Sequence, residues 1–175
     1  MEASKGKGFI GLTYYDGGAR SFYANKAIKT PADLKGLKVR VQPSPSAVKM
    51  MELLGGSATP LAYGELYTAL QQKVVDAAEN NETALTLARH GEVSKIFSQD
   101  EHTMIPDVLL ISEKTWAKLT PEQQKALKTA ADNSMMSHKE LWAKMIAEEK
   151  KKHKSKWALN LSLLKNNHLL MQPNR

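Results

Sequence analysis

An arginine near the end of a short predicted strand is the residue best suited to do chemistry in this sequence. The stretch "DLKGLKVRVQPSP" (33–45) alternates apolar and polar residues over 37–42, which predicts a strand carrying Arg40 just before its end. Ser44 and Pro45 follow, and both residue types are typical of a helix start. A guanidinium can hold a carboxylate through two hydrogen bonds, and a helix N-terminus adds a positive field. The combination would suit a small anion, although spacing alone slightly favours a surface residue or a structural ion-pair partner.

Two further places offer polar side chains that could contact a ligand. "AENNE" (78–82) ends a short apolar segment, and the amides of Asn80 and Asn81 can both donate and accept hydrogen bonds. Arg20 follows a pair of glycines, in a loop that a backbone can fold closely. Taken alone, the first is better explained as a turn before a helix and the second as an exposed loop arginine.

Catalysis and metal binding have little support in the sequence. The chain has no cysteine, and its five histidines show no paired metal-ligand spacing. A Walker loop, a GxGxxG turn and a nucleophile elbow are all missing from the sequence. We therefore expect no cofactor and rank an enzyme on an α/β scaffold last among the possible functions.

The net charge of +7 raises the alternative of a basic nucleic-acid-binding protein. Seven lysines and three glutamates between His138 and Lys156 supply more than half of this excess. Nucleic-acid-binding surfaces more often interleave basic residues with aromatic ones, so we expect this Lys-rich segment to be a solvated helix end instead. No apolar run approaches the length of about 18 residues expected of a membrane span.

Predicted strands alternate with predicted helices, which indicates an α/β fold with a parallel or mixed sheet. We expect strands over 8–15 and 157–163, a buried strand over 104–112, and a helix over 82–97. A helix of about 30 residues is expected from Pro121 to about Lys152, because Thr120 and Gln123 form a capping-box pattern and no breaker follows.

Three stretches together resemble a known family. They are "IKTPADLKGLKVRVQPSP", "GGSATPLAYGELYTALQQKVVDAAENN" and "VLLISEKTWAKLTPEQQKALKTAA". The sequence is similar, from about residue 8 to about residue 150, to the DctP-type solute-binding proteins of TRAP transporters (tripartite ATP-independent periplasmic transporters). The resemblance implies a periplasmic-binding-protein-like, type II-like lobe with a mixed sheet and one long C-terminal helix.

The resemblance also implies a division of the chain and a set of ligand-binding residues. Residues 1–105 would form the second-lobe ligand-binding core, 106–152 a strand and long helix that return to the first lobe, and 153–175 an atypical strand and tail. An arginine in the "KVRV" strand of the family pairs with the ligand carboxylate. The residues implied at the ligand are Arg40, Asn80, Arg20, Tyr63, Glu79 and Asn81. The "NN" form that includes Asn81 is similar to members that take sugar acids.

The family implies partners and a location for the protein. Its members bind small organic acids in the periplasm and deliver them to TRAP membrane permease subunits, with no nucleic acid and no cofactor. The first residues of this sequence lack a signal-peptide pattern, so we expect a missing leader or a protein that is not exported. Because most of a first lobe is also missing from the resemblance, we expect a truncated chain that binds weakly or not at all. Exposed apolar surface would then favour self-association or exchange of elements.

Overall fold

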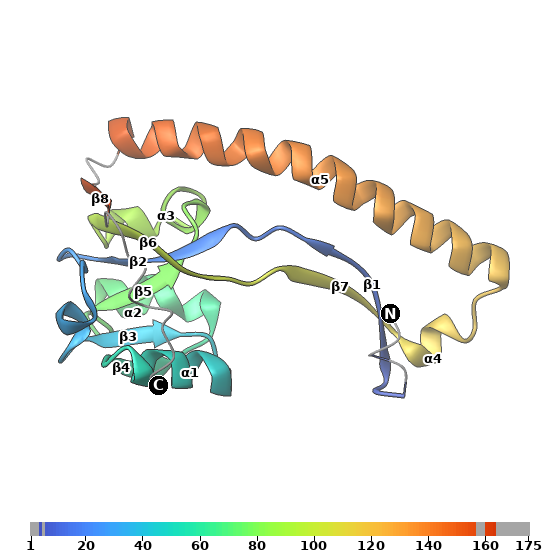
Figure 1. The fold of residues 1–175 in the computed structure, drawn as a ribbon, viewed down its shortest axis with the longest axis horizontal. Coiled ribbons are helices and arrows are strands. Elements are labelled where there is room, and N and C mark those ends of the chain that lie inside the picture. The colour runs from blue at the N-terminus through green and yellow to red at the C-terminus, as the bar shows by residue number, and fades with distance from the viewer. Residues whose placement is uncertain (1–3, 5, 157–159, 164–175) are drawn as a thin grey trace, which may run out of the picture. The chain divides into compact units, whose positions relative to one another are not determined.

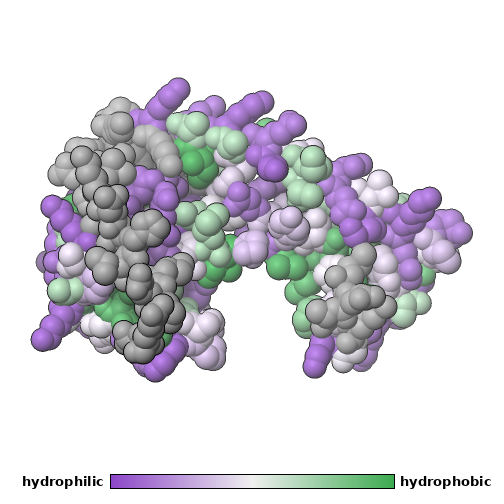
Figure 2. Space-filling view, in the orientation of Figure 1, coloured by the Kyte–Doolittle hydropathy of each residue, from purple (hydrophilic) through white to green (hydrophobic). Residues whose placement is uncertain are grey.

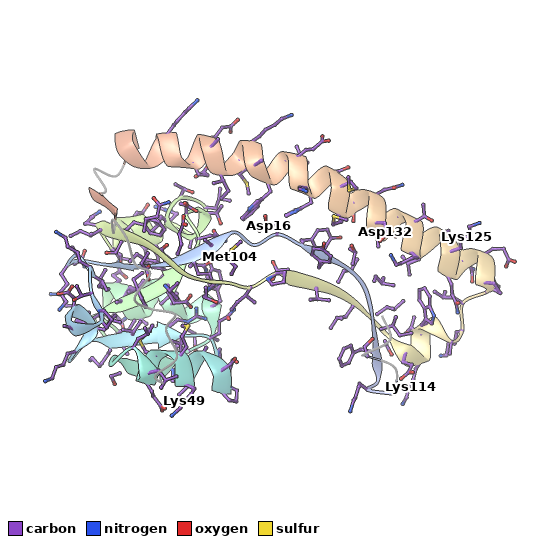
Figure 3. The ribbon with its side chains drawn as sticks, in the orientation of Figure 1. Asp16, Lys49, Met104, Lys114, Lys125 and Asp132 are labelled. Atoms are coloured by element: carbon purple, nitrogen blue, oxygen red, sulfur yellow. The ribbon has the colours of Figure 1, made fainter. Side chains whose placement is uncertain are left out.

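The computed structural model describes residues 4, 6–156 and 160–163 and has a mixed α/β fold (Figure 1). The chain forms two compact units. Unit 1 draws on 1–18 and 105–147, and unit 2 draws on 19–104 and 148–175. The chain passes between the units near Asp16, near Met104 and again between 147 and 148 (Figure 3 labels Asp16 and Met104).

Unit 2 is built on a mixed six-stranded sheet, in the order β4-β3-β5-β2-β6-β8. Its strands are β2 (Ala19–Ala24), β3 (Lys38–Val41), β4 (Ser57–Pro60), β5 (Ala77–Asn80), β6 (Ile96–Met104) and β8 (Asn160–Leu163). β3 runs parallel to both β4 and β5, whereas β2 is antiparallel to β5 and β6. The C-terminal ends of β3, β4 and β5 therefore share one edge of the sheet with the N-terminal end of β2.

Both faces of this sheet are covered by apolar side chains. Adjacent residues of a strand point to opposite faces, and Phe22 and Tyr23 of β2 accordingly belong to two different core clusters. α1 (Pro45–Leu53) adds Met51 to the Phe22 cluster, and α2 (Leu66–Gln71) adds Leu66 and Leu70 to the Tyr23 cluster. The shorter elements of unit 2 are η2 (Pro31–Leu34), η3 (Tyr63–Glu65), α3 (Thr83–Thr86) and η4 (His90–Glu92).

Helix boundaries follow local sequence signals closely. Ser44 is the N-cap residue of α1 and Pro45 its first residue, as predicted, and Gly55 ends the turn after the helix with φ +84°. The Ser44 hydroxyl, however, bonds the hydroxyl of Ser46 (2.8 Å) and caps no backbone N–H group. The capping box predicted at the start of the long helix is present: Thr120 N donates to Gln123 Oε1 at 2.9 Å, and Gln123 N to Thr120 Oγ1 at 3.3 Å.

Unit 1 contains a two-stranded antiparallel sheet, formed by β1 (Phe9–Tyr15) and β7 (Asp107–Ser112). α4 (Glu113–Trp116) follows β7 directly, and α5 (Pro121–Lys156) is the predicted long helix. On α5 the hydroxyl of Ser134 bonds that of Tyr15 at 2.8 Å, and Lys128 pairs with Asp132 on the same helix. Among the described residues, no helix is both long and apolar enough to cross a membrane.

Two predictions about the elements are wrong. The range 82–97, expected to be one helix, contains only α3 and η4 before β6 begins, because Arg89 takes a left-handed conformation (φ 62°) that interrupts helical geometry.

The strand 104–112 was expected to be buried, but Val108 and Leu110 of β7 are 55% and 49% exposed. β7 pairs only with β1 in the described chain, and hydrophobic side chains reach the surface of unit 1 (Figure 2). The predicted last strand is present as β8, while 157–159 lie outside the described residues.

Candidate functional site

The candidate site lies at the edge of the unit 2 sheet where β3, β4 and β5 end and β2 begins. Parallel strands expose their last residues and following loops at such an edge, which is where ligands bind in open α/β sheets. Arg40 lies near the end of β3, Tyr63 follows β4, and Glu79 and Asn80 end β5. Arg20 is the second residue of β2. The topology thus brings five of the six predicted site residues to one edge, and Asn81 follows them in sequence.

Arg40 is buried, so it is not the surface residue that its spacing alone favoured. It is 2% exposed, and its Nε donates to the carbonyl oxygen of Leu61 at 2.9 Å. Its guanidinium carbon lies 5.8 Å from the centre of the Tyr63 ring. Burial lowers the pKa of Arg40, and the positive charge of Arg20 acts in the same direction. Nη1 of Arg40 is fully enclosed and has no hydrogen-bond partner among the described residues.

A buried donor without a partner is uncommon and costs free energy, roughly 1–3 kcal/mol and more for a charged group. Arg40 makes no ion pair with any described carboxylate. A carboxylate entering from outside the chain would supply both the missing acceptor and the missing negative charge. Arg40 is therefore the strongest candidate for an anion-binding group in unit 2.

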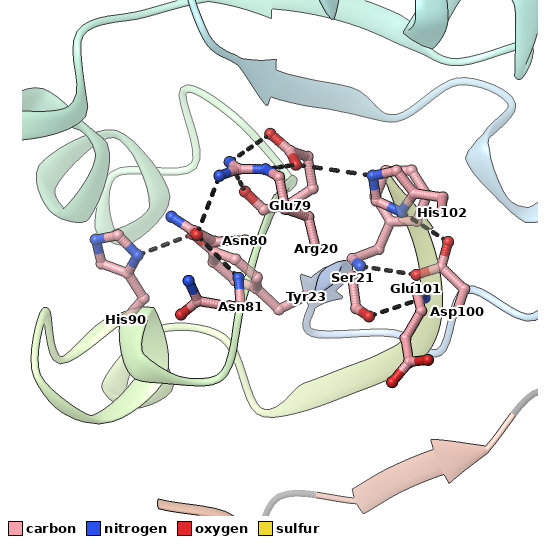
Figure 4. A network of polar contacts seen from close by, with 11 residues as sticks. Arg20, Ser21, Tyr23, Glu79, Asn80, Asn81, His90, Asp100, Glu101 and His102 are labelled. Atoms are coloured by element: carbon pink, nitrogen blue, oxygen red, sulfur yellow. Dashed lines mark hydrogen bonds and ion pairs between the residues drawn. The ribbon is translucent and has the colours of Figure 1, made fainter. Parts of the chain in front are cut away.

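Arg20 differs from Arg40 because its guanidinium is already engaged (Figure 4). Its Nε and Nη2 donate to the Glu79 carboxylate at 2.5 and 2.9 Å, and Nη2 also reaches the Glu79 carbonyl oxygen at 2.9 Å. Nη1 donates to Oδ1 of Asn80 at 3.2 Å. Burial opposes the charge of Arg20, but the Glu79 carboxylate raises the pKa of the group. The positive charge of Arg20 is thus balanced within the chain.

These contacts fix the orientation of the Asn80 amide. Oδ1 of Asn80 accepts from Arg20 and also from the backbone N–H of Asn81 at 2.8 Å. Since the oxygen is occupied by two donors, the NH₂ group is directed elsewhere and is available to donate. Asn81 follows a different pattern, because its Oδ1 accepts from Thr83 N at 3.0 Å and Thr83 Oγ1 at 2.6 Å and so orders the turn into α3.

Glu79 is further held by His102, a residue that the sequence analysis did not select. His102 Nε2 lies 3.7 Å from Glu79 Oε2, and its Nδ1 is 2.8 Å from Asp100 Oδ2. The His102 ring stacks on Phe22 with 4.3 Å between ring centres. Burial disfavours the imidazolium, but the hydrogen bond to Asp100 and the negative charges of Asp100 and Glu79 outweigh it and raise the pKa of His102 to about 9. His102 Nε2 is enclosed and has no hydrogen-bond partner among the described residues. Burial likewise opposes ionisation of Glu79, while His102 and Arg20 lower its pKa.

A distortion of β6 delivers His102 to this network. The β2–β6 register shifts between Arg20 and Phe22, and Glu101 has a positive φ of 50°. The extra residues are fastened to β2, because Phe22 N donates to Asp100 and Glu101 N donates to the hydroxyl of Ser21. An alternation pattern does not reveal a bulge, and for this reason His102 could not be selected from the sequence.

The described residues offer no group of three or more His, Cys, Asp or Glu side chains arranged to hold a metal ion. The chemistry of this edge is instead that of anion recognition: one buried arginine with an unpartnered N–H group, one oriented amide donor, and an aromatic ring against the guanidinium. No pair of groups within it resembles a nucleophile and its base.

Comparison with known proteins identifies this architecture as that of a solute-binding protein. The family model described as "Bacterial extracellular solute-binding protein, family 7" (DctP) matches residues 1–167. The chain belongs to this family, whose members are the substrate-binding proteins of TRAP transporters and not enzymes.

Individual relatives agree with this assignment. The uncharacterized protein YiiZ of Salmonella typhimurium is 49% identical over 146 residues, covering 83% of this chain and 45% of YiiZ. A TRAP periplasmic solute-binding protein from Sulfitobacter, with bound β-D-galacturonate, is 42% identical with a TM-score of 0.89, covering 93% of this chain and 54% of that one. Another from Anaerococcus prevotii, with bound D-glucuronate, is 39% identical with a TM-score of 0.90, over 95% and 54%. The chain therefore spans about half the length of these proteins.

Proposed function

We propose that this chain binds a sugar acid through its carboxylate, as part of a periplasmic substrate-binding protein that delivers the acid to TRAP-type membrane permease subunits. The unpartnered Nη1 of buried Arg40 is the observation that carries the proposal, because it lacks an acceptor that a carboxylate would supply. Structures with bound galacturonate and glucuronate, at 42% and 39% identity, support a hexuronate as the class of ligand. These solute-binding relatives do not support the alternative function, which is nucleic-acid binding through the Lys-rich segment 138–156.

Each remaining site residue has a proposed part in this binding. The Asn80 NH₂ group donates to the same carboxylate, and Tyr63 packs against the ligand beside Arg40. Arg20 borders the ligand and orients Asn80, and Glu79 keeps Arg20 in place. Asn81 shapes the turn at the edge of the site through its hydrogen bonds with Thr83.

The balance of charge favours an acid with one carboxylate. Arg20 is compensated by Glu79, and His102 by Asp100, so Arg40 is left as the uncompensated cation of the network. A second carboxylate of a C4-dicarboxylate would find no further unpaired cation at this edge of the described chain. The hydroxyl groups of a hexuronate, in contrast, can be recognised by neutral partners such as the Asn80 amide.

Isothermal titration calorimetry with D-glucuronate, D-galacturonate and succinate tests the proposal. We expect a uronate to bind more tightly than succinate, and Arg40→Ala to weaken uronate binding about 100-fold, because removing one partner of a buried charge pair costs several kcal/mol. Lys38→Ala is the matched control, since Lys38 lies on the same strand with an exposed side chain. Uronate binding as tight in Arg40→Ala as in the parent chain would refute the assignment of Arg40.

We also propose that this chain self-associates through unit 1, by covering or exchanging the β1–β7 pair. A two-stranded sheet is only marginally stable alone, and the apolar side chains of β7 are exposed. Light scattering at micromolar concentration should give a mass above that of a monomer, and a monomeric mass would contradict the proposal.

A further inference from the structure

His90 is a buried histidine that carboxylate binding, as proposed above, does not use directly. It is 2% exposed and begins η4, directly after Arg89, which adopts the left-handed conformation. A left-handed backbone at a residue other than glycine is uncommon and is retained only where surrounding contacts enforce it. His90 follows Arg89 directly, and the contacts of its buried ring can enforce this backbone conformation.

The His90 ring contacts two tyrosines, Tyr23 in the core of unit 2 and Tyr63 in the candidate site. Nδ1 of His90 lies 2.9 Å from the hydroxyl oxygen of Tyr23, a side chain with no exposed surface, and the dashed line in Figure 4 marks this bond. The His90 ring stacks on Tyr23 with 5.7 Å between ring centres and 27° between planes. It also packs against Tyr63 at 5.6 Å and 59°. Tyr63 is the ring that lies against the Arg40 guanidinium.

The protonation of this pair follows from its surroundings. Burial, followed by the positive charge of Arg40, lowers the pKa of His90 to about 4, so the imidazole is neutral at ordinary pH. Burial and nearby negative groups raise the pKa of Tyr23, so the phenol keeps its proton. Among the described residues the Tyr23 hydroxyl has no other hydrogen-bond partner, and its proton therefore points to Nδ1. His90 accepts at Nδ1 and carries its own proton on Nε2.

We propose that His90 is a positioning residue of the carboxylate site: it accepts the Tyr23 hydrogen bond and holds the Tyr63 ring against Arg40. The inference rests on the proposed function, because it concerns how Arg40 is presented to a uronate. A neutral ring suits this role, since an imidazolium at the same place could no longer accept the Tyr23 hydrogen bond at Nδ1 and would repel Arg40. Tyr63 itself is half exposed, and among the described residues its ring packs against no aromatic ring other than that of His90, so His90 is its lateral support.

Two substitutions separate the hydrogen bond from the bulk of the ring. His90→Phe keeps a flat ring but leaves the buried Tyr23 hydroxyl without its acceptor, and we expect uronate affinity to fall about tenfold. His90→Gln restores an acceptor oxygen, and we expect it to recover much of that loss. Arg89→Ala is the control, because that side chain is exposed and pairs only with Glu92 on the same turn. Circular dichroism confirms that each variant is folded before binding is compared.

Nitrogen NMR of the histidine rings gives a readout that a purely structural role would not move. We expect the free chain to show His90 with an unprotonated Nδ1 and a protonated Nε2, and we expect D-glucuronate to shift these signals in the parent chain but not in Tyr63→Ala. A proton on Nδ1, or unchanged affinity in His90→Phe, would overturn the positioning role. The proposed function would still hold in that case if Arg40→Ala weakened uronate binding as expected. If the parent chain binds no uronate at all, the proposed function fails and this inference fails with it.

Discussion

The two units of the chain differ in which side chains they bury: unit 2 buries charged ones, and unit 1 leaves apolar ones exposed. In unit 2, Arg40 and Glu79 are each 2% exposed, at the edge of a sheet whose two faces are covered by apolar clusters. In unit 1, Leu110 and Val108 of a two-stranded sheet are about half exposed. The buried charge of Glu79 has two cationic partners, whereas β7 pairs with β1 and leaves most of its side chains exposed. Unit 2 therefore encloses its charged groups at the edge of a covered sheet, whereas unit 1 leaves apolar side chains of β7 at its surface.

The strongest way to break the comparison is to remove the carboxylate at the centre of the unit 2 network. Glu79→Ala leaves Arg20 and His102 without their shared buried partner, and we expect unit 2 to lose about 3–5 kcal/mol of stability. Hydrogen-exchange mass spectrometry of β2 and β5 measures this loss. Glu52→Ala is the control, because Glu52 pairs with Lys49 on the exposed face of α1 and its loss should cost below about 0.5 kcal/mol (Figure 3 shows Lys49). Equal effects of the two variants would show that the buried network adds no stability.

A Leu→Ala substitution in each unit compares how much stability a buried and an exposed leucine contribute. Leu85→Ala removes a side chain with no exposed surface from the Tyr23 cluster of unit 2, and we expect a cost of about 2–5 kcal/mol. Leu110→Ala removes a side chain that is half exposed in unit 1, and we expect at most about 1 kcal/mol. Urea denaturation of each variant measures the difference. Comparable losses would mean that β7 is covered in solution.

The pH dependence of stability should belong to unit 2. The folded pKa of His102 is raised to about 9, so its stabilising contribution is complete below about pH 6.5 and is lost as the pH rises through 9. The folded pKa of His90 is lowered to about 4, so protonation of the unfolded chain costs stability as the pH falls from about 6.5 toward 4. The free energy of unfolding should therefore be greatest at about pH 6.5, where neither histidine has yet reduced it.

Urea midpoints measured from pH 5 to pH 9.5 test this profile. His102→Asn should flatten the alkaline side, because the group that releases a proton on that side is gone. A variant that loses stability above pH 7 as steeply as the parent chain would show that another group is responsible.

The smallest expected effect concerns the surface of unit 1. Leu110→Lys places a charge on the exposed face of β7, which should weaken association between copies of the chain with little change in the folding of unit 2. Light scattering over a concentration series measures this shift. Lys114→Ala on α4, just after β7, is a control that should leave association unchanged. A mass that depends on concentration equally in both variants would place the contact elsewhere.

Local signals predicted those parts of the fold that local physics controls. The start of α1 at Ser44-Pro45, the capping box of Thr120 and Gln123, and the breaker-free run of α5 are decided by side chains within a turn of one another. The prediction of one helix over 82–97 was wrong because Arg89 adopts the left-handed conformation, and arginine is not a residue type that signals this conformation. The exposure of β7 was missed because an apolar run shows that burial is favourable but does not show which surface will cover it.

Motifs that are contiguous in the chain were enough to predict the family, the mixed α/β class and the residues that lie at the sheet edge. The difference between Arg20 and Arg40, in contrast, depends on the packed fold. Both are arginines near strand ends, but one meets the carboxylate of Glu79 and the other meets the carbonyl of Leu61 and the ring of Tyr63. Charge balance depends on which side chains the fold places within hydrogen-bond distance, so it is a property of the packed sheet and not of spacing along the chain.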